Sequence, residues 1–232
     1  MTMQTQMLDV TGADGAFQAY FATPDSPRAG LIVIQEIFGV NSHMRDVTER
    51  LAGAGFAALT PDLFWREQPG IELGYTPEDV AKGRELKAKS EVDHAIRDVG
   101  AAFDVLSARP ECRGKKIGVI GFCYGGLITY LAAARLKPAC AASYYGGGIV
   151  GYLDEADKID CPIQFHFGQQ DSAIPLDQVE QIRAAVSGKD AEIFIYEGAG
   201  HGFHCDQRGS YNEASAKVAW ERSMTLFNNH LV

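Results

Sequence analysis

The sequence lacks long apolar runs, clustered basic charge and a cysteine framework. No apolar run approaches the roughly 20 residues that a membrane-spanning helix needs. The net charge of −9 argues against nucleic acid or an anionic membrane as a partner, because both reward clustered Lys and Arg. Five cysteines without framework spacing agree with a reducing compartment, and the first residues lack a signal-peptide pattern. We therefore expect a soluble, cytoplasmic protein.

What is present fits a single α/β domain over residues 1–232. The chain is 46% hydrophobic and 22% charged, which is ordinary for a globular protein and enough to bury a large core. It contains no repeat, low-complexity tract or linker. We expect it to act on a small molecule, as a monomer or a small homo-oligomer.

Strand-like and helix-like segments alternate along the chain, which favours a mainly parallel sheet with helices on both faces. A hairpin is expected at 3–10 and 16–22, around a turn at 12–15. The segment 64–76 resembles an irregular surface loop. The expected buried strands are 30–35, 56–60, 116–120, 139–145, 161–168 and 191–196. The expected helices are 42–54, 77–107 with a break or bend at Gly83 and Gly100, 125–136, 176–187 and 212–230.

The segment 121–125, Gly-Phe-Cys-Tyr-Gly, has the form of a nucleophile elbow with cysteine as the nucleophile. Glycines suit such a tight strand-to-helix turn, because side chains there would collide with neighbouring elements. The helix that follows points free amides and the positive end of its dipole at the sulfur, which favours the thiolate. The alternative is that Cys123 is a small buried residue at a close-packed turn.

Two other strands end in residues that complete a triad with Cys123. Asp171 follows the strand 161–168 and His201 follows the strand 191–196, which gives the order nucleophile, acid, base of α/β-hydrolases. In parallel sheets, catalytic groups collect at the carboxyl ends of the strands. Taken alone, Asp171 also fits a turn or a helix cap, and an isolated histidine such as His201 is more often structural.

A metal site is the competing interpretation of the histidine loop. His201, His204 and Cys205 offer ligands close together, with Asp206 beside them. Structural zinc sites usually pair two well-separated ligand doublets, and no second doublet exists. We therefore expect no metal and no other cofactor. His166, inside an apolar strand, is expected in the core.

Four motifs together resemble the dienelactone hydrolases (carboxymethylenebutenolidases) over almost the whole chain. They are Gln-Glu-Ile-Phe-Gly at 35–39, Gly-Phe-Cys-Tyr-Gly-Gly at 121–126, Gly-Gln-Gln-Asp at 168–171 and Ala-Gly-His-Gly-Phe at 199–203. The resemblance implies an α/β-hydrolase fold and a triad of Cys123, Asp171 and His201.

The resemblance also implies roles for neighbouring groups. Glu36 would take the thiol proton when substrate is bound, although a salt-bridged structural glutamate is the alternative. The backbone amides of Ile37 and Tyr124 would form the oxyanion hole.

The arginines that bind the substrate carboxylate in the family are displaced in this chain. Near the histidine loop the nearest is Arg208, and for a second cation the candidates are Arg66, Lys82 and Arg84. Tyr144 is a further candidate substrate contact.

By this resemblance the expected reaction is hydrolysis of a lactone or ester, converting dienelactone to maleylacetate. A broad carboxylesterase or thioesterase is the alternative within the same class. From a different class, Cys123 could be a redox-sensing thiol in a fold without catalysis, although a sensor has no use for Asp171 or His201.

Overall fold

The computed structural model describes residues 3–232, which form two compact units. Unit 1 runs to Gly118 and includes Leu231–Val232, and unit 2 is Val119–His230. The boundary falls within strand β5 (Ile117–Phe122). Among the described residues, none of the helices combines the length and apolar character required to cross a bilayer.

The strands of unit 1 follow the order β1-β2-β4-β3. The predicted hairpin is confirmed, since β1 (Met3–Gly12) and β2 (Gly15–Pro24) pair antiparallel. Strand β2 also pairs antiparallel with β4 (Phe56–Pro61), which runs parallel to β3 (Ala29–Ile34). Every residue of β3 and β4 is buried, as expected for strands covered on both faces.

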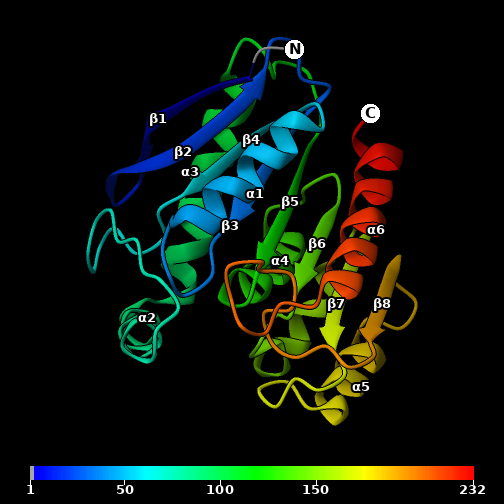
Figure 1. The fold of residues 1–232 in the computed structure, drawn as a ribbon. Coiled ribbons are helices and arrows are strands. Elements are labelled where there is room, and N and C mark those ends of the chain that lie inside the picture. Colours follow the sequence, from blue (N-terminus) through cyan, green and yellow to red (C-terminus); the bar gives the residue numbers. More distant parts are fainter. Residues whose placement is uncertain (1–2) are drawn as a thin grey trace. The chain divides into compact units, whose positions relative to one another are not determined.

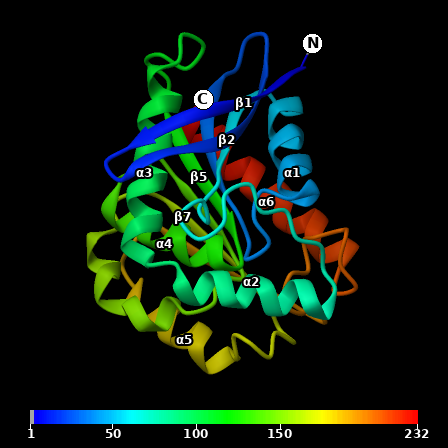
Figure 2. The ribbon, with the colours of Figure 1, turned by 90° about the vertical axis from the view of Figure 1, so that its left-hand side faces the viewer.

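Two helices of unit 1 cover opposite faces of these strands. Helix α1 (Ser42–Gly53) lies on one face and α3 (Val92–Ala108) on the other (Figures 1 and 2). Helix α1 begins after Asn41, whose side chain accepts a hydrogen bond from the backbone amide of Met44. This arrangement agrees with the predicted helix-covered sheet.

The predicted break of the helix 77–107 at its glycines is wrong. The chain forms α2 (Pro77–Lys89) and α3, and the break lies at Ser90 and Glu91. Gly83 lies inside α2, where a Cβ atom would stand 2.5 Å from the carbonyl oxygen of Ile37. Glycine is therefore present at this position because α2 closely approaches the loop after β3.

In unit 2, strands β5, β6 (Ala141–Tyr144), β7 (Ile163–Gly168) and β8 (Ala191–Tyr196) are parallel and adjacent in that order. Strand β6 is shorter than predicted. The strands alternate with α4 (Tyr124–Arg135), the 3-10 helix η1 (Ile149–Lys158), α5 (Leu176–Ala185) and α6 (Glu213–Leu231) (Figure 1). The sequence analysis did not predict η1, which is kinked at Tyr152.

Alternate residues of these strands face different helices. Tyr144 and His166 lie opposite each other in register, and both reach Ser223 of α6, with oxygen–oxygen and nitrogen–oxygen distances of 2.8 and 3.2 Å. On the other face, Ser143 donates a hydrogen bond to the Gly126 carbonyl of α4. The prediction that His166 lies in the core is confirmed, and burial lowers its pKa to about 3.

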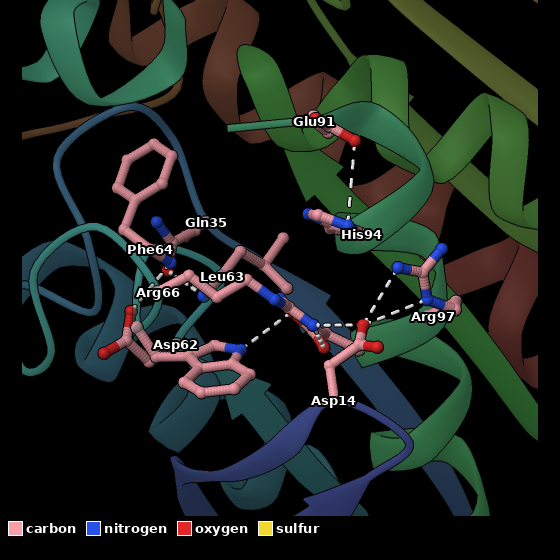
Figure 3. Close-up of polar contacts among 11 residues, drawn as sticks. Asp14, Gln35, Asp62, Leu63, Phe64, Arg66, Glu91, His94 and Arg97 are labelled. Carbon is pink, nitrogen blue, oxygen red and sulfur yellow. Dashed lines mark hydrogen bonds and ion pairs between the residues drawn. The ribbon is translucent and has the colours of Figure 1, made fainter. Parts of the chain in front are cut away.

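The segment after β4, which carries Trp65 and Arg66, is held in unit 1 by ion pairs that Figure 3 shows. Arg66 donates to Asp98 Oδ1 at 3.0 Å and to Asp14 Oδ2 at 2.7 Å, and Arg97 also reaches Asp14. Trp65 Nε1 donates to the same Asp98, whose side chain is 2% exposed. Burial lowers the pKa of Arg66, but the two carboxylates outweigh it and raise that pKa. Arg66 is therefore engaged in holding the loop.

Replacing Arg66 with Ala should destabilise the protein more than replacing Arg97 with Ala. The first change leaves a carboxylate in the interior without its cation, which costs about 3 kcal/mol, whereas exposed pairs contribute about 1 kcal/mol or less. Urea denaturation of both variants measures the difference. Equal losses of unfolding free energy would show that the Arg66 pair contributes no more than a surface pair.

Candidate active site

Cys123 occupies a strained backbone position between β5 and α4. Its φ of 55° and ψ of −114° place it among three non-glycine residues with positive φ in the described chain. Such conformations cost about 1–3 kcal/mol and concentrate at functional sites. A Cβ atom at Gly121 would collide with the Gly125 carbonyl and with Thr129, so the turn requires glycine there.

The three predicted triad side chains meet within unit 2. The Cys123 Sγ atom lies 3.1 Å from His201 Nε2, and His201 Nδ1 lies 2.7 Å from Asp171 Oδ2. The three residues come from the ends of β5, β7 and β8, as the sequence predicted. One imidazole thus joins a sulfur to a carboxylate.

Asp171 is fixed on the side away from the histidine. Its Oδ1 atom accepts the backbone amides of Ala173 at 2.9 Å and Ile174 at 3.2 Å. Its side chain is fully buried, whereas that of His201 is 24% exposed. Asp171 therefore accepts the amides of the local turn with one oxygen and bonds the His201 ring with the other.

Two neighbouring groups, Cys123 and Asp171, act on the pKa of the His201 imidazole. Burial lowers the pKa of His201, but Cys123 and Asp171 outweigh it and raise that pKa to about 10. An imidazole with so high a pKa keeps its proton throughout the neutral range. A protonated ring can donate to the Cys123 sulfur and to the Asp171 carboxylate at the same time.

His204 of the histidine loop lies among aromatic rings. His204 is 2% exposed and its ring stacks on Phe122 and Trp220, with centroids 5.2 and 5.6 Å away. His201 is engaged by Cys123 and Asp171. These contacts assign His204 to an aromatic cluster between β5 and α6.

The predicted substrate contacts of unit 2 fall in two different places. Arg208 lies against Gly202, where any Cβ atom would meet its guanidinium, so a cation stands one residue from His201. Tyr144 is fully buried and its hydroxyl is bonded to Ser223. This position favours sheet packing as the role of Tyr144.

The remaining predicted residues lie as follows. Tyr124 is the first residue of α4 and directly follows Cys123, so its role in the oxyanion hole stays a prediction. Glu36 and Ile37 belong to unit 1, between β3 and α1. Glu36 is fully buried, and its Oε2 accepts the Tyr75 hydroxyl at 3.4 Å. Arg84 is exposed on α2. The roles of Glu36, Ile37 and Arg84 stay predictions.

Sequence analysis missed Tyr145, which contacts the imidazole directly. Its ring centroid lies 5.2 Å from that of His201, and its φ is 37°. The available signal was the Gly-Gly-Gly run at 146–148 directly after it, which marks a second tight turn at a strand end.

Comparison with known proteins places the whole chain in one group. The model of the dienelactone hydrolase family matches residues 17–231. A protein of Synechocystis, provisionally named carboxymethylenebutenolidase, is 42% identical over 87% of this chain and 86% of its own. A protein of Escherichia coli K12 with the same name is 35% identical over 91% and 82%. The crystal structure of a provisionally named dienelactone hydrolase from Klebsiella pneumoniae is 32% identical, covers 98% of this chain and 99% of its own, and has a TM-score of 0.88. The predicted α/β-hydrolase fold is thereby confirmed.

Iodoacetamide should alkylate Cys123 at about pH 6 at least about tenfold faster in the wild type than in His201→Gln. His201, whose pKa is about 10, stays protonated at this pH and should pair with an ionised sulfur. The advantage should shrink as pH rises towards about 8.5, where the cysteine of the variant also ionises. Mass spectrometry of quenched samples measures the rates, and Cys123→Ser gives the background. The four other cysteines are buried. Equal rates in both proteins at about pH 6 would contradict the ion pair.

Proposed function

The chain belongs to the dienelactone hydrolase family of ester and lactone hydrolases, and from this premise we propose that Cys123, His201 and Asp171 hydrolyse the bond through an acyl-enzyme. The observation that carries the proposal is the continuous contact from sulfur to imidazole to carboxylate. A thiolate nucleophile with an oriented imidazole is the arrangement that acyl transfer requires.

In the first half-reaction, the Cys123 thiolate attacks the carbonyl carbon and the carbonyl oxygen takes the negative charge. The amide of Tyr124, and by resemblance that of Ile37, donate to this oxyanion. The tetrahedral intermediate collapses, the bond to the leaving oxygen breaks and His201 supplies that oxygen with a proton. A lactone ring thereby opens, while its acyl group stays on sulfur as a thioester.

In the second half-reaction, water attacks the thioester. Neutral His201 takes one proton from the water, and the Asp171 carboxylate stabilises the imidazolium that forms. The carbon–sulfur bond breaks, a carboxylic acid leaves, and the sulfur and imidazole return to their paired state. The net change is one lactone or ester bond replaced by the elements of water, with no cofactor needed.

We propose an unsaturated lactone bearing a carboxylate, such as dienelactone, as the substrate, with maleylacetate as its product. The guanidinium of Arg208 beside Gly202 supports this class, because it can bind a carboxylate next to the imidazole. A cysteine nucleophile works in its reduced form, which agrees with the expected cytoplasmic location.

Hydrolysis of dienelactone and of p-nitrophenyl acetate by a panel of variants tests the proposal. Cys123→Ala and Asp171→Asn should each lower kcat by about a thousandfold or more, since they remove the nucleophile or the group that orients the base. Asp177→Asn, at an exposed carboxylate in the first turn of α5, is the matched control. Absence of turnover of both substrates by the wild type would reject hydrolysis and leave the redox-sensing thiol.

The same panel tests the role proposed for Glu36. If this carboxylate takes the thiol proton only when substrate is bound, the free enzyme holds a thiol, so the free wild type is alkylated no faster at about pH 6 than His201→Gln, and Glu36→Gln loses turnover. Fast alkylation of the free wild type would instead assign ionisation of the sulfur to His201 and exclude this role. A variant with unchanged turnover would assign Glu36 to structure.

A further inference from the structure

A second strained turn stands beside the nucleophile elbow in unit 2. Cys123 and Tyr145 each follow a strand, and the preceding residues Phe122 and Tyr144 are paired in register. Both have positive φ, 55° and 37°. The strand hydrogen bonds continue through both, since Cys123 donates to the Tyr144 carbonyl at 3.0 Å and Tyr145 donates to the His166 carbonyl at 2.8 Å. For a bulky residue such as tyrosine, this conformation is a genuine outlier.

The two turns interlock through glycine. A Cβ atom at Gly126 would stand 2.8 Å from the Cα of Gly146, and one at Gly146 would stand 2.8 Å from the carbonyl carbon of Gly126. Ser143 adds a hydrogen bond of 2.9 Å to the Gly126 carbonyl. The backbone that carries Tyr145 is therefore fixed against the backbone that carries the nucleophile.

This second turn presents the ring of Tyr145 to the imidazole. Tyr145 is fully buried, and its ring meets that of His201 at 5.2 Å with an interplanar angle of 61°. The ring also packs edge-to-face against Phe203 at 5.3 Å and lies 6.2 Å from Phe122. Edge-to-face contacts at these distances are favourable and have a preferred geometry.

His201 needs such a contact because its own backbone restrains it little. It lies between Gly200 and Gly202, and Gly202 has a φ of 75°. The hydrogen bonds to Asp171 and Cys123 hold the two nitrogens, but tilt of the ring about the line between them is limited by packing. The ring nitrogens meet the Asp171 carboxylate and the Cys123 sulfur, and the guanidinium of Arg208 lies beside Gly202, the next residue along the chain.

We propose that Tyr145 is a positioning residue for His201, whose ring holds the imidazole plane in line with the Cys123 sulfur and the Asp171 carboxylate. The inference rests on the proposed function, in which His201 is the acid and base of the reaction. On this inference, the strained turn at Tyr145 places an aromatic ring at the site, as the strained turn at Cys123 places the thiol.

The pH profile of Cys123 alkylation tests this role without any ester substrate. In Tyr145→Leu the ring is lost, so alkylation at about pH 6 should fall at least about tenfold and the profile should move towards the pH at which an ordinary cysteine ionises. With p-nitrophenyl acetate, kcat should fall while KM changes little. Tyr130→Leu is the matched control, because Tyr130 is also fully buried but packs near Phe165 and bonds to the Tyr152 carbonyl.

Tyr145→Phe keeps the ring and should keep the wild-type profile. If Tyr145→Leu does not fold, Tyr145→Met replaces it and should show the same slower alkylation and the same lower kcat. A folded Leu or Met variant with the wild-type profile overturns the proposal, as does a Phe variant that shifts the profile as far as Leu. If the wild type hydrolyses no ester but Tyr145→Leu still shifts alkylation, the proposed function fails while the positioning of His201 stands.

Discussion

The contact between the Cys123 sulfur and the His201 imidazole is the interaction on which the rest of unit 2 depends. At 3.1 Å the ring can donate to the sulfur, and the carboxylate lies 2.7 Å away on the other nitrogen. Burial lowers the pKa of His201, but these two neighbours outweigh it and raise that pKa to about 10. Each member comes from a different strand end. The parallel strands, with helices on both faces, are what bring them to one place.

The site contains a strained residue and a buried carboxylate, both of which cost free energy. Cys123 has a conformation that side chains avoid, and the Asp171 carboxylate is buried with its second oxygen satisfied by backbone amides. Buried polar groups of this kind are costly unless every partner is in place. The tightly packed glycines of the elbow and the register of the unit 2 strands keep those partners in place.

Much of this arrangement was predictable from sequence because it is encoded locally. The Gly-x-Cys-x-Gly turn, and the chain order of Cys123, Asp171 and His201 at three strand ends, predicted which side chains would meet. The predicted break of the helix at Gly83 was wrong, because this glycine lets α2 approach the Ile37 carbonyl, a contact that no local propensity shows. The glycines at 146–148 signal a turn, but the positive φ of Tyr145 was hidden, since nothing in a tyrosine signals it.

The most direct test of the proposed chemistry is to trap the acyl-enzyme. Wild-type protein quenched in acid during turnover of p-nitrophenyl acetate should carry an acetyl group on the peptide containing Cys123, and the group should disappear as substrate is exhausted. An acetyl group that never appears on Cys123 while product accumulates, or one that appears on another residue in proportion to turnover, would contradict the sulfur–imidazole mechanism.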